Sequence, residues 1–291
     1  MIIDIHAHTS THRMRGLHTD SATILDLERI ASRRRIDKIV LMATYFPFKG
    51  SGLHNNELLS RVAGKELFSV FGSLDVTGDF SAGLDELTKL AEEKKIVGIK
   101  LYPGYQFFSP SDQNIFPIYE LAQKFDLPVA IHTGELHHCC PREKRDQGLG
   151  RCGMIACPLD DDATKKLAHP ESIHGAAVNF PKVNFILCHL SDPYFTSLRS
   201  LMLECPNVYS DISGQFLSGT DEASQEEKQK VIIEILKILD LPNGINRLMF
   251  GTDFPIQSYF DSIQLVESLG LNEYNSEKIY SGNALKIIFH Q

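Results

Sequence analysis

Long apolar stretches are the first feature that this sequence lacks. No run of about 18 apolar residues occurs in the chain, so the sequence predicts no transmembrane helix. The first residues, MIIDIHAHTS, have neither a basic segment nor a long apolar core, and are therefore not typical of a secretory signal peptide. We expect a cytoplasmic protein with no membrane as partner.

Cysteine and basic clusters are also sparse. Six cysteines in 291 residues are too few for a disulfide-stabilised domain, and without a secretory signal we expect reduced thiols. Asp and Glu outnumber Lys and Arg by 37 to 29, which gives a formal net charge of -8. The longest basic run, Arg33-Arg34-Arg35, ends a helical stretch, where it complements the helix dipole. Without a basic patch, nucleic acid is not the expected partner.

What the sequence does contain is a strand-like segment followed by a helix-like segment, repeated eight times. Several strand-like segments are apolar without alternation, as expected of parallel strands that are covered on both faces. Between them, apolar residues recur at helical spacing, as in Leu84, Leu87, Leu90 and Ala91. The strand-like segments are residues 2–6, 36–43, 67–75, 96–103, 128–134, 183–190, 207–214 and 247–255.

This alternation predicts an α/β fold, a (β/α)8 TIM barrel in one domain over residues 1–291. A doubly wound open sheet would show the same alternation, and only the placement of the polar residues described next distinguishes the two. Residues 135–167, after the fifth strand, have no clear period. A stretch of that length predicts a lid or an insertion loop within the barrel.

Ligand-type residues end four of the predicted strands. Asp4, His6 and His8 follow the strand period, so regular alternation would place all three on one side of the first strand. Because the carboxyl ends of barrel strands converge, the sequence predicts one metal site there. A nitrogen-rich set with a single carboxylate favours zinc or another divalent transition metal over calcium or magnesium. The predicted ligands are His6, His8, His132, His189 and Asp253.

The same segments carry a family resemblance. HAH on the first strand, IHTG on the fifth, FILCHL on the sixth and GTDFP on the eighth resemble the amidohydrolase superfamily. The likeness is strongest to its amidohydrolase-2 branch, which includes aminocarboxymuconate-semialdehyde decarboxylase, and it extends through GIKLYPGYQ and IYSGNALKIIF. The resemblance implies that His6, His8, His132 and Asp253 hold the metal. It also implies that His189 is a second-site ligand or a catalytic base.

The predicted activity is hydrolysis of an amide, lactone or ester bond in a small molecule by a metal-activated water. Bound zinc lowers the pKa of water to about 7. The predicted catalytic residues are Asp253, as general base, and His189, which would shuttle the proton or stabilise the oxyanion. Non-oxidative decarboxylation or hydration of an unsaturated or aromatic acid, a lyase reaction, stays open for the same site. A catalytically dead barrel that acts as a binding protein is disfavoured, since no ligand position is missing.

Lys100 on the fourth strand has three interpretations. It is a carboxylated lysine bridging two metals, a cation for an anionic substrate, or half of a buried ion pair. TatD-type nucleases are similar at the first and last strands but have a glutamate at this strand, so Lys100 disfavours that branch. We expect one metal per chain rather than two. We predict that a carboxylate-bearing substrate is bound by Lys100, Tyr102, Arg13 and Arg15. Alternatively, Tyr102 only packs against its neighbours, and Arg13 and Arg15 lie in a solvated loop.

Four of the six cysteines cluster after the fifth strand, at Cys139, Cys140, Cys152 and Cys157. Their spacing lacks the paired CxxC motifs of zinc modules. Inert thiols are therefore expected ahead of a structural zinc ion or a role in a substrate loop. The sequence leaves a homo-oligomer open, because every barrel helix needs an apolar face for the core in any case.

Overall fold

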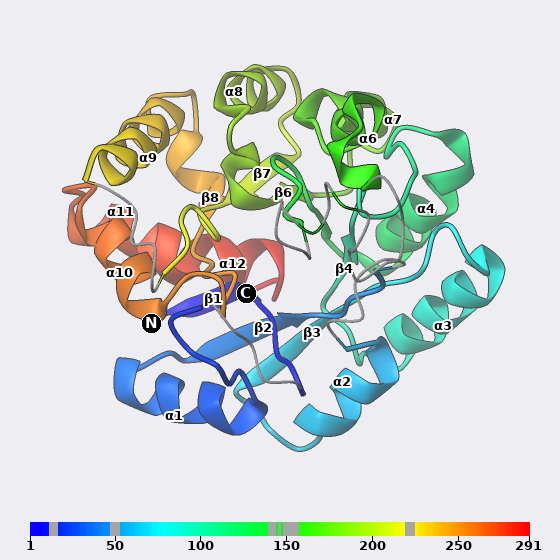
Figure 1. The fold of residues 1–291 in the computed structure, drawn as a ribbon, viewed down its shortest axis with the longest axis horizontal. Helices are drawn as coiled ribbons and strands as arrows, with labels where there is room; N and C mark the ends of the chain where they lie inside the picture. The colour runs from blue at the N-terminus through cyan, green and yellow to red at the C-terminus, as the bar shows by residue number, and fades with distance from the viewer. Residues whose placement is uncertain (12–16, 47–52, 139–143, 145–146, 148–156, 219–224) are drawn as a thin grey trace.

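A computed structural model of the chain confirms the (β/α)8 barrel. It describes residues 1–11, 17–46, 53–138, 144, 147, 157–218 and 225–291. Eight strands lie at the centre and helices surround them (Figure 1). Each strand pairs in parallel with the next in chain order. The strands are β1 Ile3–Ala7, β2 Lys38–Met42, β3 Phe68–Gly72, β4 Gly98–Leu101, β5 Val129–Ile131, β6 Phe185–Leu187, β7 Val208–Asp211 and β8 Leu248–Met249.

Backbone hydrogen bonds between the two ends of the sheet close the barrel. The Ile5 N–H donates to the Phe250 carbonyl at 3.0 Å, and the His8 N–H donates to the Phe254 carbonyl at 2.7 Å. Every strand overlaps its predicted segment, but most are shorter at the carboxyl end. There the chain leaves the ladder and turns over the mouth of the barrel, and this is where the predicted ligands lie.

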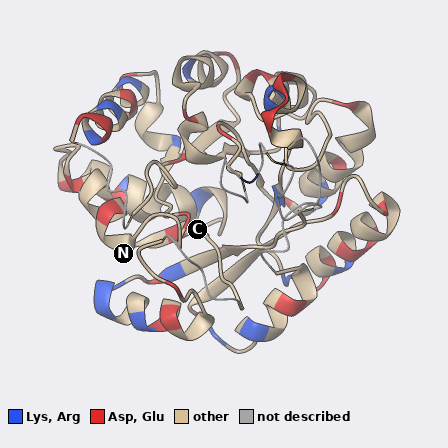
Figure 2. Ribbon diagram, viewed as in Figure 1, with Lys and Arg blue, Asp and Glu red and all other residues tan. Residues whose placement is uncertain are grey.

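Helices alternate with the strands as predicted, and the predicted helical residues Leu84, Leu87, Leu90 and Ala91 lie in one helix, Phe80–Glu92. Helix α1 shows why they form: Thr23 and Asp26 make a capping box at its start, and Arg33 and Arg34 lie in its last turn. Acidic and basic residues are interspersed along the outer helices (Figure 2). The helices are α1 Ile24–Arg34, α2 Asn55–Val62, α3 Phe80–Glu92, α4 Phe116–Phe125, α6 Asp162–Leu167, α7 His174–Asn179, α8 Phe195–Glu204, α9 Gln225–Leu239, α10 Tyr259–Glu267, α11 Glu273–Glu277 and α12 Asn283–Ile287.

The predicted aperiodic stretch, residues 135–167, is partly regular. It contains the short 3-10 turn Pro158–Asp160 and α6, while residues 139–143, 145–146 and 148–156 lie outside the described part of the chain. Among the described residues, no helix is long and apolar enough to cross a bilayer.

Strand side chains alternate between two apolar layers. In β2, Ile39 and Leu41 face outward and join a core that includes Leu27 of α1. Val40 and Met42 face inward and pack with residues of α12. Toward the carboxyl ends of the strands the inward positions become polar, and this change marks the site.

Strand β1 departs from regular alternation. Its register against β2 shifts between Asp4 and Ala7, so Ile5 and His6 both face the interior. Asp4 instead faces outward, where its carboxylate accepts a hydrogen bond from Thr252 Oγ1 at 2.7 Å and interacts with Tyr259 of α10. The expectation that Asp4 shares one side with His6 and His8 is therefore wrong, because this bulge reverses the alternation.

The two layers predict how substitutions in α1 affect stability. Leu27→Ala should lower the free energy of unfolding by about 2–5 kcal/mol, because Leu27 is fully buried and leaves a cavity. Leu25→Ala is the matched control in the same helix. Leu25 is 53% exposed, so its substitution should change stability by less than about 0.5 kcal/mol. Equal losses in urea-induced unfolding would contradict the assignment of the buried face.

Candidate metal centre

Two histidines and an aspartate converge at the junction of the first and last strands. His6 and His8 lie at the carboxyl end of β1, and Asp253 follows β8. The Asp253 Oδ1 atom is 3.2 Å from His8 Nε2 and 3.6 Å from His6 Nε2. Asp253 has a φ of 55°, an uncommon backbone for a residue other than glycine, and such residues concentrate at functional sites. These three predicted ligands are brought together.

Asp211, at the end of β7, holds His6 in place. Its Oδ2 atom lies 2.9 Å from His6 Nδ1, and its Oδ1 atom accepts the His189 backbone N–H at 2.9 Å. Oδ1 also accepts from the backbone N–H and the hydroxyl of Ser213. Because a carboxylate accepts hydrogen bonds, Nδ1 of His6 is the protonated nitrogen, and Nε2 keeps its lone pair toward Asp253.

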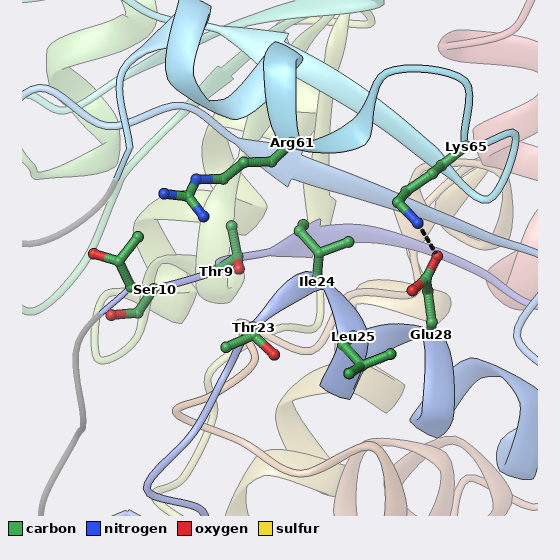
Figure 3. Close-up of a pocket in the computed structure, with 9 residues that line it drawn as sticks. Thr9, Ser10, Thr23, Ile24, Leu25, Glu28, Arg61 and Lys65 are labelled. Atoms are coloured by element: carbon green, nitrogen blue, oxygen red, sulfur yellow. Dashed lines mark hydrogen bonds and ion pairs between the residues drawn. The ribbon is translucent and has the colours of Figure 1, made fainter.

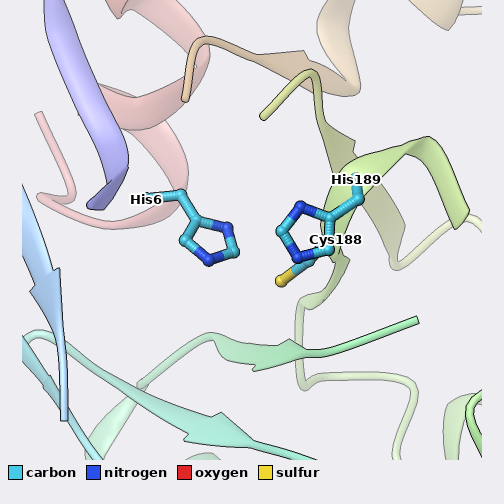
Figure 4. A group of neighbouring side chains, drawn as sticks. All are labelled: His6, Cys188 and His189. Carbon is cyan, nitrogen blue, oxygen red and sulfur yellow. The ribbon is translucent and has the colours of Figure 1, made fainter. Parts of the chain in front are cut away.

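His189 and Cys188 face His6 from the end of β6 (Figure 4). The ring centroids of His6 and His189 are 4.7 Å apart. His189 has a φ of 62°, and its Nδ1 atom lies 3.2 Å from the Ser213 carbonyl oxygen. Gly214 lies against this ring, and a Cβ atom there would lie 2.9 Å from His189 Nδ1. The absence of a side chain at Gly214 keeps the site open.

His132, which follows β5, lies beside His189 and Tyr105. Its ring centroid is 5.1 Å from that of His189 and 4.8 Å from that of Tyr105, and its Nε2 atom is 3.2 Å from the Glu135 carbonyl oxygen. Of the ligand groups formed by the described residues at the mouth, one contains His6, His8 and Asp253, and the other contains His6, Cys188 and His189. His132 is in neither group, so its role as a ligand stays a prediction.

Lys100 is fully buried on the inner side of β4. Its Nζ atom donates to Cys188 Sγ at 2.7 Å and lies 5.1 Å from the Tyr102 ring centroid. Within the described residues no carboxylate oxygen lies within 4.0 Å of Nζ, so the structure gives no support to a buried ion pair. Tyr102 donates its hydroxyl to the Ala43 carbonyl at 2.9 Å and packs edge-on against Phe46. It forms part of an aromatic wall beside the ammonium group.

Burial keeps His6, His132 and His189 neutral. Desolvation, with the nearby charge of Lys100, lowers the pKa of His6 to about 3. Desolvation likewise lowers the pKa of His132 and of His189. Burial alone would raise the pKa of Asp253, but the hydrogen bond with His8 and the electrostatic interactions with His189 and His6 hold it below its usual range. Neutral imidazoles and an ionised carboxylate are the forms that bind a metal, so the donor set fits one.

Other predicted residues lie away from this centre or cannot be placed. Arg13 and Arg15 are outside the described residues, as are Cys139, Cys140 and Cys152.

A separate pocket of about 530 Å³ lies between α1 and α2 (Figure 3). Its cations already have partners, because Arg61 pairs with Glu57 at 2.8 Å and Lys65 with Glu28 at 2.6 Å. This pocket contains none of the predicted site residues.

The sequence reasoning missed Asp211 and Ser213. A signal for them existed, because the seventh strand ends in Ser210-Asp211-Ile212-Ser213-Gly214, a hydrophilic end like those of the strands that carry the predicted ligands. Residue type alone does not distinguish a carboxylate that binds a metal from one that orients a histidine ligand.

Comparisons with known proteins identify the family of the chain. A family model described as amidohydrolase matches residues 46–289. No curated protein sequence matches the chain.

Solved structures match over nearly the whole chain at low identity. A zinc-bound amidohydrolase from Burkholderia multivorans is 14% identical with a TM-score of 0.69, and 99% of each chain is covered. A probable 2-pyrone-4,6-dicarboxylic acid hydrolase from Acinetobacter baumannii, with citric acid bound, is 15% identical with a TM-score of 0.66, again with 99% of each chain covered. A 5-carboxyvanillate decarboxylase from Sphingomonas paucimobilis is 15% identical with a TM-score of 0.62, covering 93% of this chain and 84% of that one. At these identities the likeness shows the fold.

The Asp211–His6 contact predicts a loss of metal affinity on substitution. Asp211→Asn should weaken zinc binding about 10- to 100-fold, because the carboxylate that orients the His6 ring is lost. Competition with a chromophoric chelator measures the affinity. Asp240→Asn, at an exposed position after α9, is the matched control and should bind zinc as the wild type does. Unchanged affinity in Asp211→Asn would contradict the orienting role.

Proposed function

The chain belongs to the amidohydrolase family, and from this premise we propose that it is a metal-dependent hydrolase of a small, carboxylate-bearing molecule. The bond cleaved is an amide, lactone or ester. The observation that carries the proposal is the convergence of His6, His8 and Asp253 beside His189, at the carboxyl ends of the strands, where barrel enzymes hold their active sites.

One divalent transition metal at the barrel centre is part of the proposal, with zinc favoured by the donor set. His6 Nε2, His8 Nε2 and the Asp253 carboxylate would hold it, with His132 as the further predicted ligand. When bound, the metal supplies Lewis acidity toward a carbonyl group and lowers the pKa of water. The zinc in the amidohydrolase from Burkholderia multivorans supports this choice.

His189 is the residue best suited to move the proton. Its Nδ1 atom faces the Ser213 carbonyl oxygen at 3.2 Å, and a carbonyl oxygen can only accept, so in the neutral ring Nδ1 carries the proton. Nε2 is then free to accept a proton from the attacking water and to return it to the leaving group. Asp253, ionised and in contact with His8, is the second candidate base.

The burial of Lys100 is evidence for a substrate that carries a carboxylate. An ammonium group without a carboxylate partner is costly to bury, and a substrate anion would offset that cost. Tyr102, Phe46 and Tyr105 form the aromatic wall beside it. The probable 2-pyrone-4,6-dicarboxylic acid hydrolase acts, by its name, on an acid of this kind. We therefore propose a small molecule, rather than nucleic acid or a membrane, as the partner.

The aromatic wall also favours a second candidate, non-oxidative decarboxylation or hydration of an aromatic or unsaturated acid. A planar ring could stack against Tyr102 and Tyr105 while its carboxylate meets Lys100. The decarboxylase from Sphingomonas paucimobilis has the same fold. In this reaction Nε2 of His189 would take a proton from a bound water and pass it to the ring carbon as carbon dioxide leaves.

A substrate screen tests the proposal directly. The zinc-loaded protein should release acid from a carboxylated lactone, amide or ester, whereas release of carbon dioxide from an aromatic acid alone would favour the second candidate.

Two variants test the roles of the histidines. His189→Ala should lower kcat at least about 100-fold while keeping most of the metal at the barrel centre. His6→Ala should lose both this metal and the activity. Equal metal loss in the two variants would make His189 a primary ligand. Failure to bind any divalent metal would overturn the proposal.

Lys100→Met tests substrate recognition separately. Loss of a charge-assisted contact worth about 1.5–3 kcal/mol should lower kcat/KM about 10- to 100-fold for a carboxylated substrate. The uncharged ester of the same substrate is the control and should lose little. An equal loss of kcat/KM for the carboxylated substrate and for its ester would show that Lys100 maintains the structure of the site rather than binding the carboxylate.

A further inference from the structure

A second group of ligand-type side chains lies outside the barrel centre, at the two ends of the segment that follows β5. The ligand atoms of His138, Cys157 and Asp160 all lie within 4.8 Å of one another. His138 Nε2 is 2.8 Å from Asp160 Oδ1. We propose that these three side chains bind a zinc ion, with water as the fourth ligand. This clamp site is separate from the metal centre and does not depend on the proposed activity.

The local backbone explains why two of the three donors share a face. Cys157 precedes the 3-10 turn Pro158–Asp160, and the Asp160 N–H donates to the Cys157 carbonyl at 3.0 Å. This hydrogen bond closes the turn and keeps the two residues close together. The thiol of Cys157 and the carboxylate of Asp160 therefore lie within 4.8 Å of each other, and His138 approaches them from the other end of the segment.

The two segments that carry the ligands of the clamp site are both anchored in the same buried apolar cluster. Leu136, two residues before His138, and Leu159, inside the turn, are 4% and 3% exposed. They share one apolar cluster with Tyr102, Tyr105 and Ala168. The backbone N–H of His137 donates to the Tyr105 hydroxyl at 2.7 Å. The donors are thus positioned by buried neighbours on both sides, which lowers the entropy cost of binding an ion.

The donor set selects the ion. One imidazole nitrogen, one thiolate sulfur and one carboxylate oxygen suit zinc, whereas calcium and magnesium prefer oxygen ligands. A surface ion pair is the simpler explanation for His138 and Asp160, whose side chains are 24% and 52% exposed. Such an exposed pair contributes little stability, and it does not account for the position of the Cys157 thiol. Binding would release the thiol proton.

The clamp site lies against the metal centre without being part of it. The Tyr105 ring centroid is 4.8 Å from that of His132, and its hydroxyl contacts His137 next to the clamp ligand. Zinc at the clamp site would fix both ends of the segment against this tyrosine. It would thereby stabilise one wall of the mouth.

Metal content of the full chain tests the clamp site. Protein kept reduced and reconstituted with zinc alone should hold about two ions per chain, and Cys157→Ser about one. Cys205→Ser, at a buried position outside both sites, is the matched control and should still hold two. His6→Ala should lose only the ion of the metal centre, so failure of that centre is distinguishable from failure of the clamp site. Zinc content unchanged by Cys157→Ser would overturn the inference.

Cobalt(II) in place of zinc gives a readout specific for the thiolate. The wild type should show a sulfur-to-cobalt charge-transfer band in the near ultraviolet, which Cys157→Ser should lose and Cys188→Ser should keep. Loss of the band only in Cys188→Ser would place the thiolate inside the barrel and overturn the inference. Should Cys157→Ser fail to fold, Asp160→Asn and His138→Gln should each weaken the band in titrations with cobalt. An unchanged band in both variants would also overturn it.

Discussion

The Asp211 carboxylate is the interaction on which the arrangement of the centre depends. One oxygen fixes the ring of His6 on β1, and the other accepts the backbone N–H of His189 after β6 and two donors of Ser213 after β7. Burial alone would raise the pKa of Asp211, but interactions with His6 and His189 and the hydrogen bond from Ser213 keep it below its usual range. The cost of burying this charge is thus offset by the same contacts that set the geometry.

Barrel closure explains why such a residue is needed. Each strand delivers a side chain to the mouth independently, and nothing in a single strand fixes its position relative to the others. The bulge in β1 turns His6 inward at the expense of regular alternation. Left-handed backbone at His189 and Asp253 adds further local strain. The buried Asp211 carboxylate ties two of these irregular segments together, at His6 and at His189.

The sequence predicted the repeating pattern well and the irregular positions poorly. Strand and helix periods depend on local composition, so all eight strands and the convergence of His6, His8 and Asp253 could be predicted from it. The outward orientation of Asp4 could not, because a bulge is a property of the pairing between β1 and β2. The position of His132 beside His189 and Tyr105 depends on where the chain leaves β5. The association of His138 with Asp160 joins residues 22 positions apart, and no periodic pattern in the sequence predicts it.

The net charge of the centre determines whether it favours an anionic substrate. The imidazoles with lowered pKa values are neutral, so among the described residues Asp211, Asp253 and the Lys100 ammonium are the charged groups of the centre. Two carboxylates and one ammonium group leave a single negative charge, which is unfavourable for binding an anion. A divalent ion on the His6, His8 and Asp253 set reverses that sign and leaves one positive charge, which a single substrate carboxylate would neutralise. Metal binding and carboxylate binding should therefore be coupled, since each makes burial of the other's charge less costly.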